Sequence, residues 1–289
     1  MPQRSMGLLV PTLTAMLLAA CSGAPPTPTP EPTPPADAGF LLRVTVVQAL
    51  PPQVTFGWRP TLLITLDGRV LTAGAVPAIF PGPLVNPIVE RKLTPAGWST
   101  IVAAARAAGL LSGQGDFTGG VMPPGSMATQ LQIIADGRLH ELTGDQSRIK
   151  VCVTTPCVPQ PGTPEAFAGF LADLGSVDTW LAADLGPSGI HAPAGFAIIA
   201  GPPPDQQGLE QPSIAWPLAG GFAAFGKALA DGSGNRCGSV AGDALAALRP
   251  ALAAATQITR WRDPVDGSFH GLVVRPLLPG DSNPCEGLV

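Results

Sequence analysis

TLLITLDGRVL, residues 61–71, has a close counterpart in QLQIIADGRLH, residues 130–140. Each places an Asp-Gly pair between two apolar stretches, which is the strongest short-range signal for a β-hairpin. A third pair, Asp266-Gly267, precedes an apolar run at residues 271–278. Glycine at these positions suits the positive φ that a tight turn requires. The sequence therefore predicts three antiparallel hairpins.

Helical patterns lie between these hairpins. Thr94-Pro95 and Thr163-Pro164 each combine an N-cap with proline at the first helical position. The first helix is expected to end at Gly109 in the left-handed conformation. The second has an apolar stripe at helical spacing, formed by Phe167, Phe170, Leu171 and Leu174. A third helical pattern continues through Pro250, so we expect a helix kinked at that residue.

This order of elements predicts an α+β fold with mainly antiparallel sheets, each backed by helices on one face. Hairpin and helix recur along the chain, which suggests two related subdomains, at residues 39–186 and 187–289. A seven-residue strand is expected at residues 194–200, within the second of them. A single mixed sheet is the alternative arrangement.

The N-terminus has the pattern of an export signal. Residues 1–4 form a small positive n-region ending in Arg4, residues 6–18 are an apolar h-region, and the run ends in Leu18-Ala19-Ala20-Cys21. The apolar run is too short to span a bilayer as a helix of the mature protein. LAAC resembles the lipobox of bacterial lipoproteins, and this resemblance implies that residues 1–20 are a signal peptide and that Cys21 carries a diacylglycerol thioether. The alternative is an ordinary secretory signal in which the cysteine is incidental.

A Pro/Thr-rich stretch follows the predicted lipidation site, and residues 21–38 are interpreted as a disordered tether. SGAPPTPTPEPTPPADA, residues 22–38, has too few apolar side chains to offset the entropy of ordering. In a polyproline II conformation it would reach roughly 50 Å. The sequence thus predicts a body held near the extracytoplasmic face of the cell membrane, or in a periplasm, with the membrane as a partner through Cys21.

The four remaining cysteines are Cys152, Cys157, Cys237 and Cys285. An even number in an oxidising compartment favours disulfides, and four cysteines allow three pairings. We favour Cys152 with Cys157, because only four residues separate them and Pro156 favours a turn, and then Cys237 with Cys285 by elimination. A zinc site is the alternative, but no histidine stands at ligand spacing. We therefore expect neither a metal nor another cofactor.

Composition excludes some partners. The net charge is −4 with only 16 Lys and Arg residues, so no basic patch indicates nucleic-acid binding.

Motifs for catalysis and for calcium binding are weak. Ser147-Arg148-Ile149-Lys150 matches S-x-x-K without its partner motifs, and no G-x-S-x-G is present. Asp231–Asn235 begins like a calcium loop, but Arg236 stands where glycine is needed, so a flexible turn is predicted.

Histidines and tryptophans are the remaining candidates for a site. His140 and His270 occupy the same place in their hairpins, but solvent-facing strand positions explain them better. His191 is expected in a surface loop. Trp216 and Trp261 are candidates for an exposed binding platform, although burial in the core is the stronger expectation.

The C-terminal part carries a second resemblance. Its residues are Cys237, Thr259-Arg260-Trp261, VRPLLP at 274–279 and Cys285. The pattern resembles the ends of uncharacterised lipoproteins from GC-rich bacteria, and the similarity extends to Asp67-Gly68-Arg69 and the helix at residues 93–111. It implies a secreted, lipid-anchored domain and no particular activity.

The function that these observations favour is a non-enzymatic binding or interaction module for an unknown protein or small molecule. The alternative is a cell-envelope hydrolase whose active-site residues are scattered along the sequence. No catalytic or cofactor-binding residue is assigned.

Overall fold

The computed structural model describes residues 39–48, 50–112, 115–118, 125–145, 159–205, 208–210 and 212–289. Cys21 and the tether, Cys152 and Cys157, and the S-x-x-K motif at residues 147–150 lie outside these ranges. The described chain has the α+β fold with mainly antiparallel sheets that the sequence predicts, and its two sheets have eight and six strands.

The first sheet contains the two similar hairpins. Its strand order is β5-β7-β6-β1-β2-β3-β4-β8, antiparallel except for the parallel β5–β7 pair. The bounds are β1 Phe40–Gln48, β2 Leu62–Thr65, β3 Arg69–Ala73, β4 Ile88–Lys92, β5 Asp116–Phe117, β6 Met127–Ala135, β7 Arg138–Gly144 and β8 Gly189–Ile190.

The Asp-Gly turns connect the strands as predicted. β2 pairs with β3 around Gly68 (φ 76°), and β6 pairs with β7 around Asp136 and Gly137, whose φ angles are 52° and 73°. Two successive positive φ angles characterise a type I′ turn, whose twist matches that of the strands it joins. The third pair, Asp266-Gly267, lies between two antiparallel strands of the second sheet.

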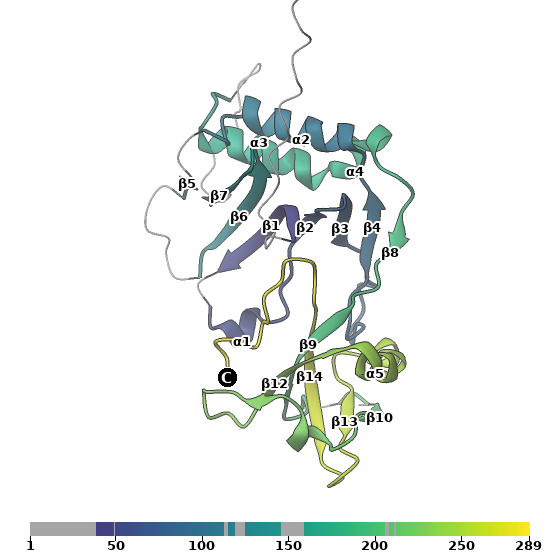
Figure 1. Ribbon diagram of the computed structural model, residues 1–289. Coiled ribbons are helices and arrows are strands. Elements are labelled where there is room, and N and C mark those ends of the chain that lie inside the picture. Colours follow the sequence, from purple (N-terminus) through teal and green to yellow (C-terminus); the bar gives the residue numbers. More distant parts are fainter. Residues whose placement is uncertain are drawn as a thin grey trace, which may run out of the picture. The chain divides into compact units, whose positions relative to one another are not determined.

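Two capped helices cover one face of the first sheet (Figure 1). They are α2, Pro95–Ala107, and α3, Pro164–Gly175. The hydroxyl of Thr94 accepts from the N–H of Gly97 at 3.1 Å, and that of Thr163 accepts from Ala166 at 3.3 Å. Both predicted N-caps are confirmed, and Gly109 follows α2 with φ 72°.

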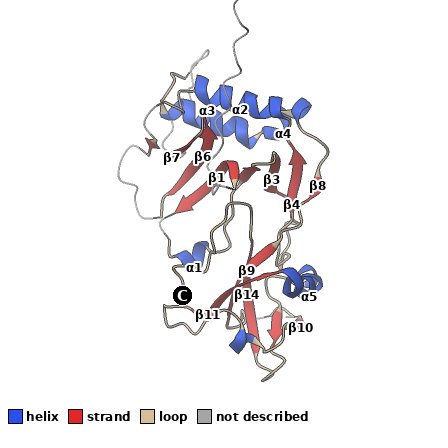
Figure 2. Cartoon of the chain, viewed as in Figure 1, coloured by secondary structure: helices blue, strands red, loops and turns tan. Residues whose placement is uncertain are grey.

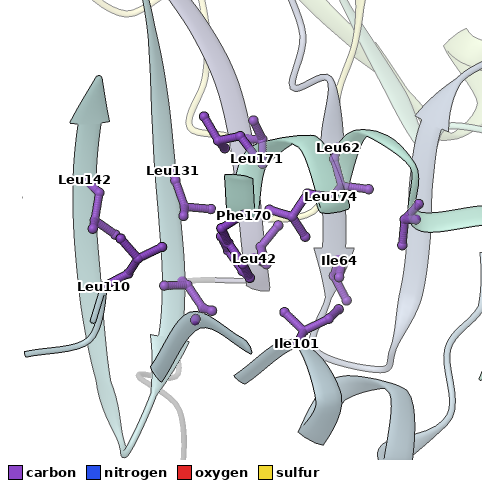
Figure 3. Close-up of a cluster of buried hydrophobic side chains, with 14 of the residues drawn as sticks. Leu42, Leu62, Ile64, Ile101, Leu110, Leu131, Leu142, Phe170, Leu171 and Leu174 are labelled. Carbon is purple, nitrogen blue, oxygen red and sulfur yellow. The ribbon is translucent and has the colours of Figure 1, made fainter. Parts of the chain in front are cut away.

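Alternation along the strands divides the first sheet into two faces. Buried side chains of α2 and α3, such as Ile101 and Phe170, pack on Leu42, Ile64 and Leu131 (Figure 3). The residues between these positions point to the other face. There Leu63 joins a smaller apolar cluster with Phe40, Leu71, Ile88 and Leu278.

The second sheet is centred on β9, whose sequence GFAIIAG is almost continuously apolar. Its order is β10-β13-β14-β9-β12-β11, all antiparallel except for the parallel β10–β13 pair. The bounds are β9 Gly195–Gly201, β10 Ser213–Ala215, β11 Lys227–Ala228, β12 Arg236–Ala241, β13 Arg260–Arg262 and β14 Phe269–Pro276. Both faces of β9 are covered, with Ile198 in one apolar cluster and Ile199 in another.

The remaining helices are short, apart from α5 (Figure 2). Helix α5, Gly242–Ala254, packs Leu245, Leu248 and Leu252 on the second sheet and contains Pro250, as predicted. The short helices are α1 Pro52–Thr55, α4 Val177–Trp180, η2 Ala182–Asp184 and η3 Phe222–Ala224.

Some contacts cross the predicted subdomain boundary at residues 186 and 187. Strand β8 lies after this boundary but pairs with β4 of the first sheet. Leu278, from the C-terminal tail, is buried in the cluster that contains Phe40 and Leu63. The boundary and the relatedness of the two subdomains stay predictions.

The predicted Cys237–Cys285 disulfide is present. It joins β12 to the C-terminal tail, with 5.6 Å between the two Cα atoms. Both cysteines are buried beside Ile199, Leu229 and Leu288. A bridge across 48 residues of sequence is worth about 4 kcal/mol in the chain-entropy model. The pairing of Cys152 with Cys157 lies outside the described residues.

Replacing both Cys237 and Cys285 by serine should lower the free energy of unfolding by up to about 4 kcal/mol. Local opening should increase most from Val240 onward, because the bridge restrains the tail that follows α5 and β14. Hydrogen exchange followed by mass spectrometry tests this, with the β2–β3 hairpin as the internal reference. Equal acceleration in the hairpin and in the C-terminal segment would contradict it.

Candidate functional site

A row of polar side chains lies on the face of the first sheet that is turned away from α2 and α3. Leu42, Val44 and Leu131 point toward the helices, so the alternating residues of β1 and β6 point the other way. Arg43 stands opposite Gln132 in the strand register, and Thr45 stands opposite Gln130. These four side chains form the floor of a polar pocket.

The walls of this pocket come from distant segments. Trp58 and Arg59 follow α1, Arg275 is near the end of β14, and Asp281 lies in the C-terminal tail. The cavity has a volume of about 280 Å³. Its described lining also includes Val46, Val47, Gln48, Thr55 and Pro60. We call it the arginine pocket.

Asp281 fixes two of the three arginines. Its Oδ1 atom accepts from Nη2 of Arg43 at 3.1 Å and from Nη2 of Arg275 at 3.2 Å. Its Oδ2 atom accepts from the backbone N–H of Leu278 at 2.9 Å. The Asp281 side chain is only 2% exposed. Both of its oxygens are therefore engaged inside the protein.

The remaining contacts of the arginines differ from one another. The Nε atoms of Arg43 and Arg275 are buried and have no hydrogen-bond partner among the described residues. The guanidinium of Arg43 also lies over the ring of Phe40, 4.7 Å from its centroid. Arg59 is held differently, because its two terminal nitrogens donate to the carbonyl oxygens of Asn86 and Pro87, both at 3.3 Å.

The charge balance of the pocket is positive, with three arginines and one aspartate. Burial lowers the pKa of Arg43, and nearby Asp281 raises it while Arg275 lowers it further. Burial also lowers the pKa of Arg59. Arginine stays protonated at neutral pH despite such shifts. The positive excess favours an anionic ligand, because guanidinium groups form strong charge-assisted hydrogen bonds with carboxylates and phosphates.

A second cavity, of about 700 Å³, lies on the helix side of the first sheet. Its described lining is mainly apolar and comes from β1, β2, β3, β6, α3 and α4. Representative residues are Val44, Leu62, Leu171, Leu174 and Val177. Asp178 at its edge is paired with Arg91 at 2.7 Å. No described residue that lines this cavity carries an unpaired charge that could orient a ligand. The arginine pocket is therefore the better candidate site.

The histidines do not form one site. His140 is on β7 of the first sheet and His270 on β14 of the second. Burial, followed by the charge of Arg138, lowers the pKa of His140. His270 contacts the Ser268 hydroxyl at 3.0 Å and lies against the ring of Phe222.

His191 is more constrained than a surface-loop residue. Its side chain is 8% exposed, and its Nδ1 atom is 2.6 Å from Oε2 of Glu90. It lines a small, mainly apolar pocket of about 250 Å³ together with Ile190, Phe196 and Arg249. None of the described residues lining that pocket is a serine, threonine, cysteine or lysine. The described lining therefore places none of these nucleophilic side chains beside His191.

The two tryptophans considered as a binding platform are in the core, which was the stronger expectation from the sequence. Trp216 and Trp261 are buried, with exposures of 2% and 0%, so they form core rather than an exposed platform. Their rings contact each other edge to face at 6.0 Å. Trp58, which no sequence pattern singled out, lines the arginine pocket instead.

The motif that begins like a calcium loop has a structural role. Asp231–Asn235 is a turn in which Asp231 accepts from the N–H of Ser233 at 2.9 Å. Across the residues that the structure describes, no three His, Cys, Asp or Glu side chains are grouped to hold a metal ion. Within the same residues, no helix is long and apolar enough to cross a membrane.

Comparisons of the chain with protein-family models, with curated proteins and with solved structures find no match. The assignment of a function therefore depends on the geometry of the sites.

Replacing Asp281 by asparagine should lower the free energy of unfolding by about 3 kcal/mol, because two largely buried guanidinium groups lose their counter-charge. Urea denaturation measures the change. Asp136→Asn is a matched control, since its pair with Arg106 is more than half exposed on both sides and is worth at most about 1 kcal/mol. Equal effects of the two substitutions would contradict the role given to Asp281.

Proposed function

We propose that this protein is a lipid-anchored, extracytoplasmic, non-enzymatic binding module, and that the arginine pocket binds the anionic group of its ligand. The observation that carries the proposal is the positive excess of the pocket lining, which has three arginines and one aspartate whose two oxygens are already bonded. A bound anion would offset this positive charge and accept hydrogen bonds from guanidinium groups of the lining.

Sequence and disulfide support the extracytoplasmic location. The lipobox-like LAAC and the Pro/Thr-rich stretch after it support the proposal of a tethered lipoprotein. The Cys237–Cys285 bridge fits an oxidising compartment. The proposed membrane partner is reached through lipid on Cys21.

Binding is favoured over hydrolysis by the types of side chain in the pocket. Its described lining offers guanidinium, amide, hydroxyl and indole groups, and a carboxylate whose two oxygens are already bonded. A hydrolase needs a group that can accept or transfer a proton near neutral pH. His191, the histidine paired with Glu90, lies in a different pocket, whose described lining has no serine, threonine, cysteine or lysine.

If Cys21 carries the anchor, the full-length protein expressed in a bacterium should partition into the detergent phase. Cys21→Ser should shift it to the aqueous phase, because the diacylglycerol that holds it in the membrane cannot be attached. Phase separation followed by immunoblotting measures the distribution, with Cys285→Ser as a cysteine control that keeps the anchor. Unchanged partitioning of Cys21→Ser would overturn the lipidation proposal.

Acetate and inorganic phosphate serve as minimal anionic probes of the pocket. At millimolar concentrations, at least one of them should shift the side-chain N–H resonances of Arg43 and Arg275 in NMR spectra. Arg43→Gln should abolish the shift at Arg275, while Arg69→Gln, outside the pocket lining, should not. Spectra unaffected by both anions, or a shift that survives Arg43→Gln in a folded protein, would overturn the anion-binding proposal.

A further inference from the structure

We infer that the ligand of the arginine pocket is an acidic sugar, a hydroxylated ring that carries a carboxylate or a phosphate group. This inference rests on the proposed function and names the ligand class of the same site. It depends on the hydrogen-bonding groups beside the arginines, which a simple anion would leave unused.

The pocket presents acceptors as well as donors. Gln132 donates its amide N–H to Glu141 at 2.6 Å, which leaves its amide oxygen available. Gln48 donates its amide to the carbonyl of Gly125 at 2.7 Å and likewise retains its oxygen. A carboxylate can only accept hydrogen bonds, and the dianion of inorganic phosphate has a single O–H to donate, so neither can satisfy both oxygens. Hydroxyl groups can donate to them.

Two further polar groups stand next to each other on the pocket floor. Thr45 and Gln130 are cross-strand partners, and their side chains make no hydrogen bond within the described part of the chain. A hydroxyl and a primary amide each both donate and accept, which matches the behaviour of sugar hydroxyls. The floor is therefore suited to a ring with several adjacent hydroxyls.

Trp58 supplies an apolar surface at the pocket wall. An indole ring offers a broad apolar face, which can pack on the C–H groups of a sugar ring. The cavity volume of about 280 Å³ lies near the lower limit for small-molecule sites, so it suits one or two sugar units rather than a long chain.

The same arrangement disfavours a free amino acid. An ammonium group needs an acceptor of negative charge, and Asp281 is the one acidic residue among the described lining. Its Oδ1 atom is shared by Arg43 and Arg275, and its Oδ2 atom is bonded to the backbone of Leu278. A cationic group would thus meet a pocket that is already positively charged.

Titration calorimetry on the full-length protein compares glucuronate with acetate, and glucose 6-phosphate with inorganic phosphate. At least one acidic sugar should bind about tenfold or more tightly than its simple anion, because the ring adds hydrogen bonds to the amides. Glucose should bind weakly or not at all. The recovered sugar should be chemically unchanged.

Gln130→Ala should weaken binding of the acidic sugar by about three- to tenfold and leave acetate binding unchanged. Gln160→Ala, an exposed position outside the pocket lining, is the matched control. If simple anions bind as tightly as both acidic sugars, or Gln130→Ala weakens acetate and glucuronate equally, the sugar inference is overturned while anion binding stands. If no anion binds, both proposals fail.

Discussion

The buried carboxylate of Asp281 is the contact on which the arrangement of this protein's candidate site depends. It joins Arg43 of the first sheet to Arg275 of the second, and its other oxygen holds the backbone of the tail at Leu278. Two guanidinium groups of the same sign would repel each other in a partly desolvated place, so each can be buried only because the carboxylate lies between them. The same turn places the Leu278 side chain in the apolar cluster around Phe40 and Leu63. One charged residue thereby positions an apolar contact as well.

Local sequence signals predict most of the described fold because they act over a few residues. An Asp-Gly pair sets a turn whether or not the rest of the chain is known, and Asp136-Gly137 adopts the positive φ angles that such a turn needs. Thr94 and Thr163 cap helices for an equally local reason, since each hydroxyl reaches an N–H three residues ahead. The Cys237–Cys285 pairing also followed from the sequence, although only by elimination among four cysteines.

The candidate site could not be predicted in this way, because its members meet only after the strands are in register. Arg43 and Asp281 are 238 positions apart in the sequence. In the run FLLRVTVVQ, Arg43 is a polar residue at a position facing away from the helices, and such a residue would ordinarily be solvated. Trp58 follows a four-residue helix and has no periodic partner. Conversely, Trp216 and Trp261 attract notice as large aromatic residues but fill the core of the second sheet. Burial of a charge, rather than the presence of a charge, distinguishes the site.

A pocket made from β1, β6, β14 and the tail exists only when the described body is fully folded. The disulfide at Cys285 lies four positions beyond Asp281, so it restrains the same tail that carries the carboxylate. A ligand that binds the folded pocket and not the unfolded chain would stabilise the fold by mass action, by about 2.7 kcal/mol at one hundred times its dissociation constant. Ion pair, covalent bridge and ligand would then act on one segment, residues 277–285. Because Asp281 of that segment lines the pocket, loss of any one of the three should weaken the stabilisation of the segment by the other two. The energies of the ion pair and the bridge should therefore not be additive.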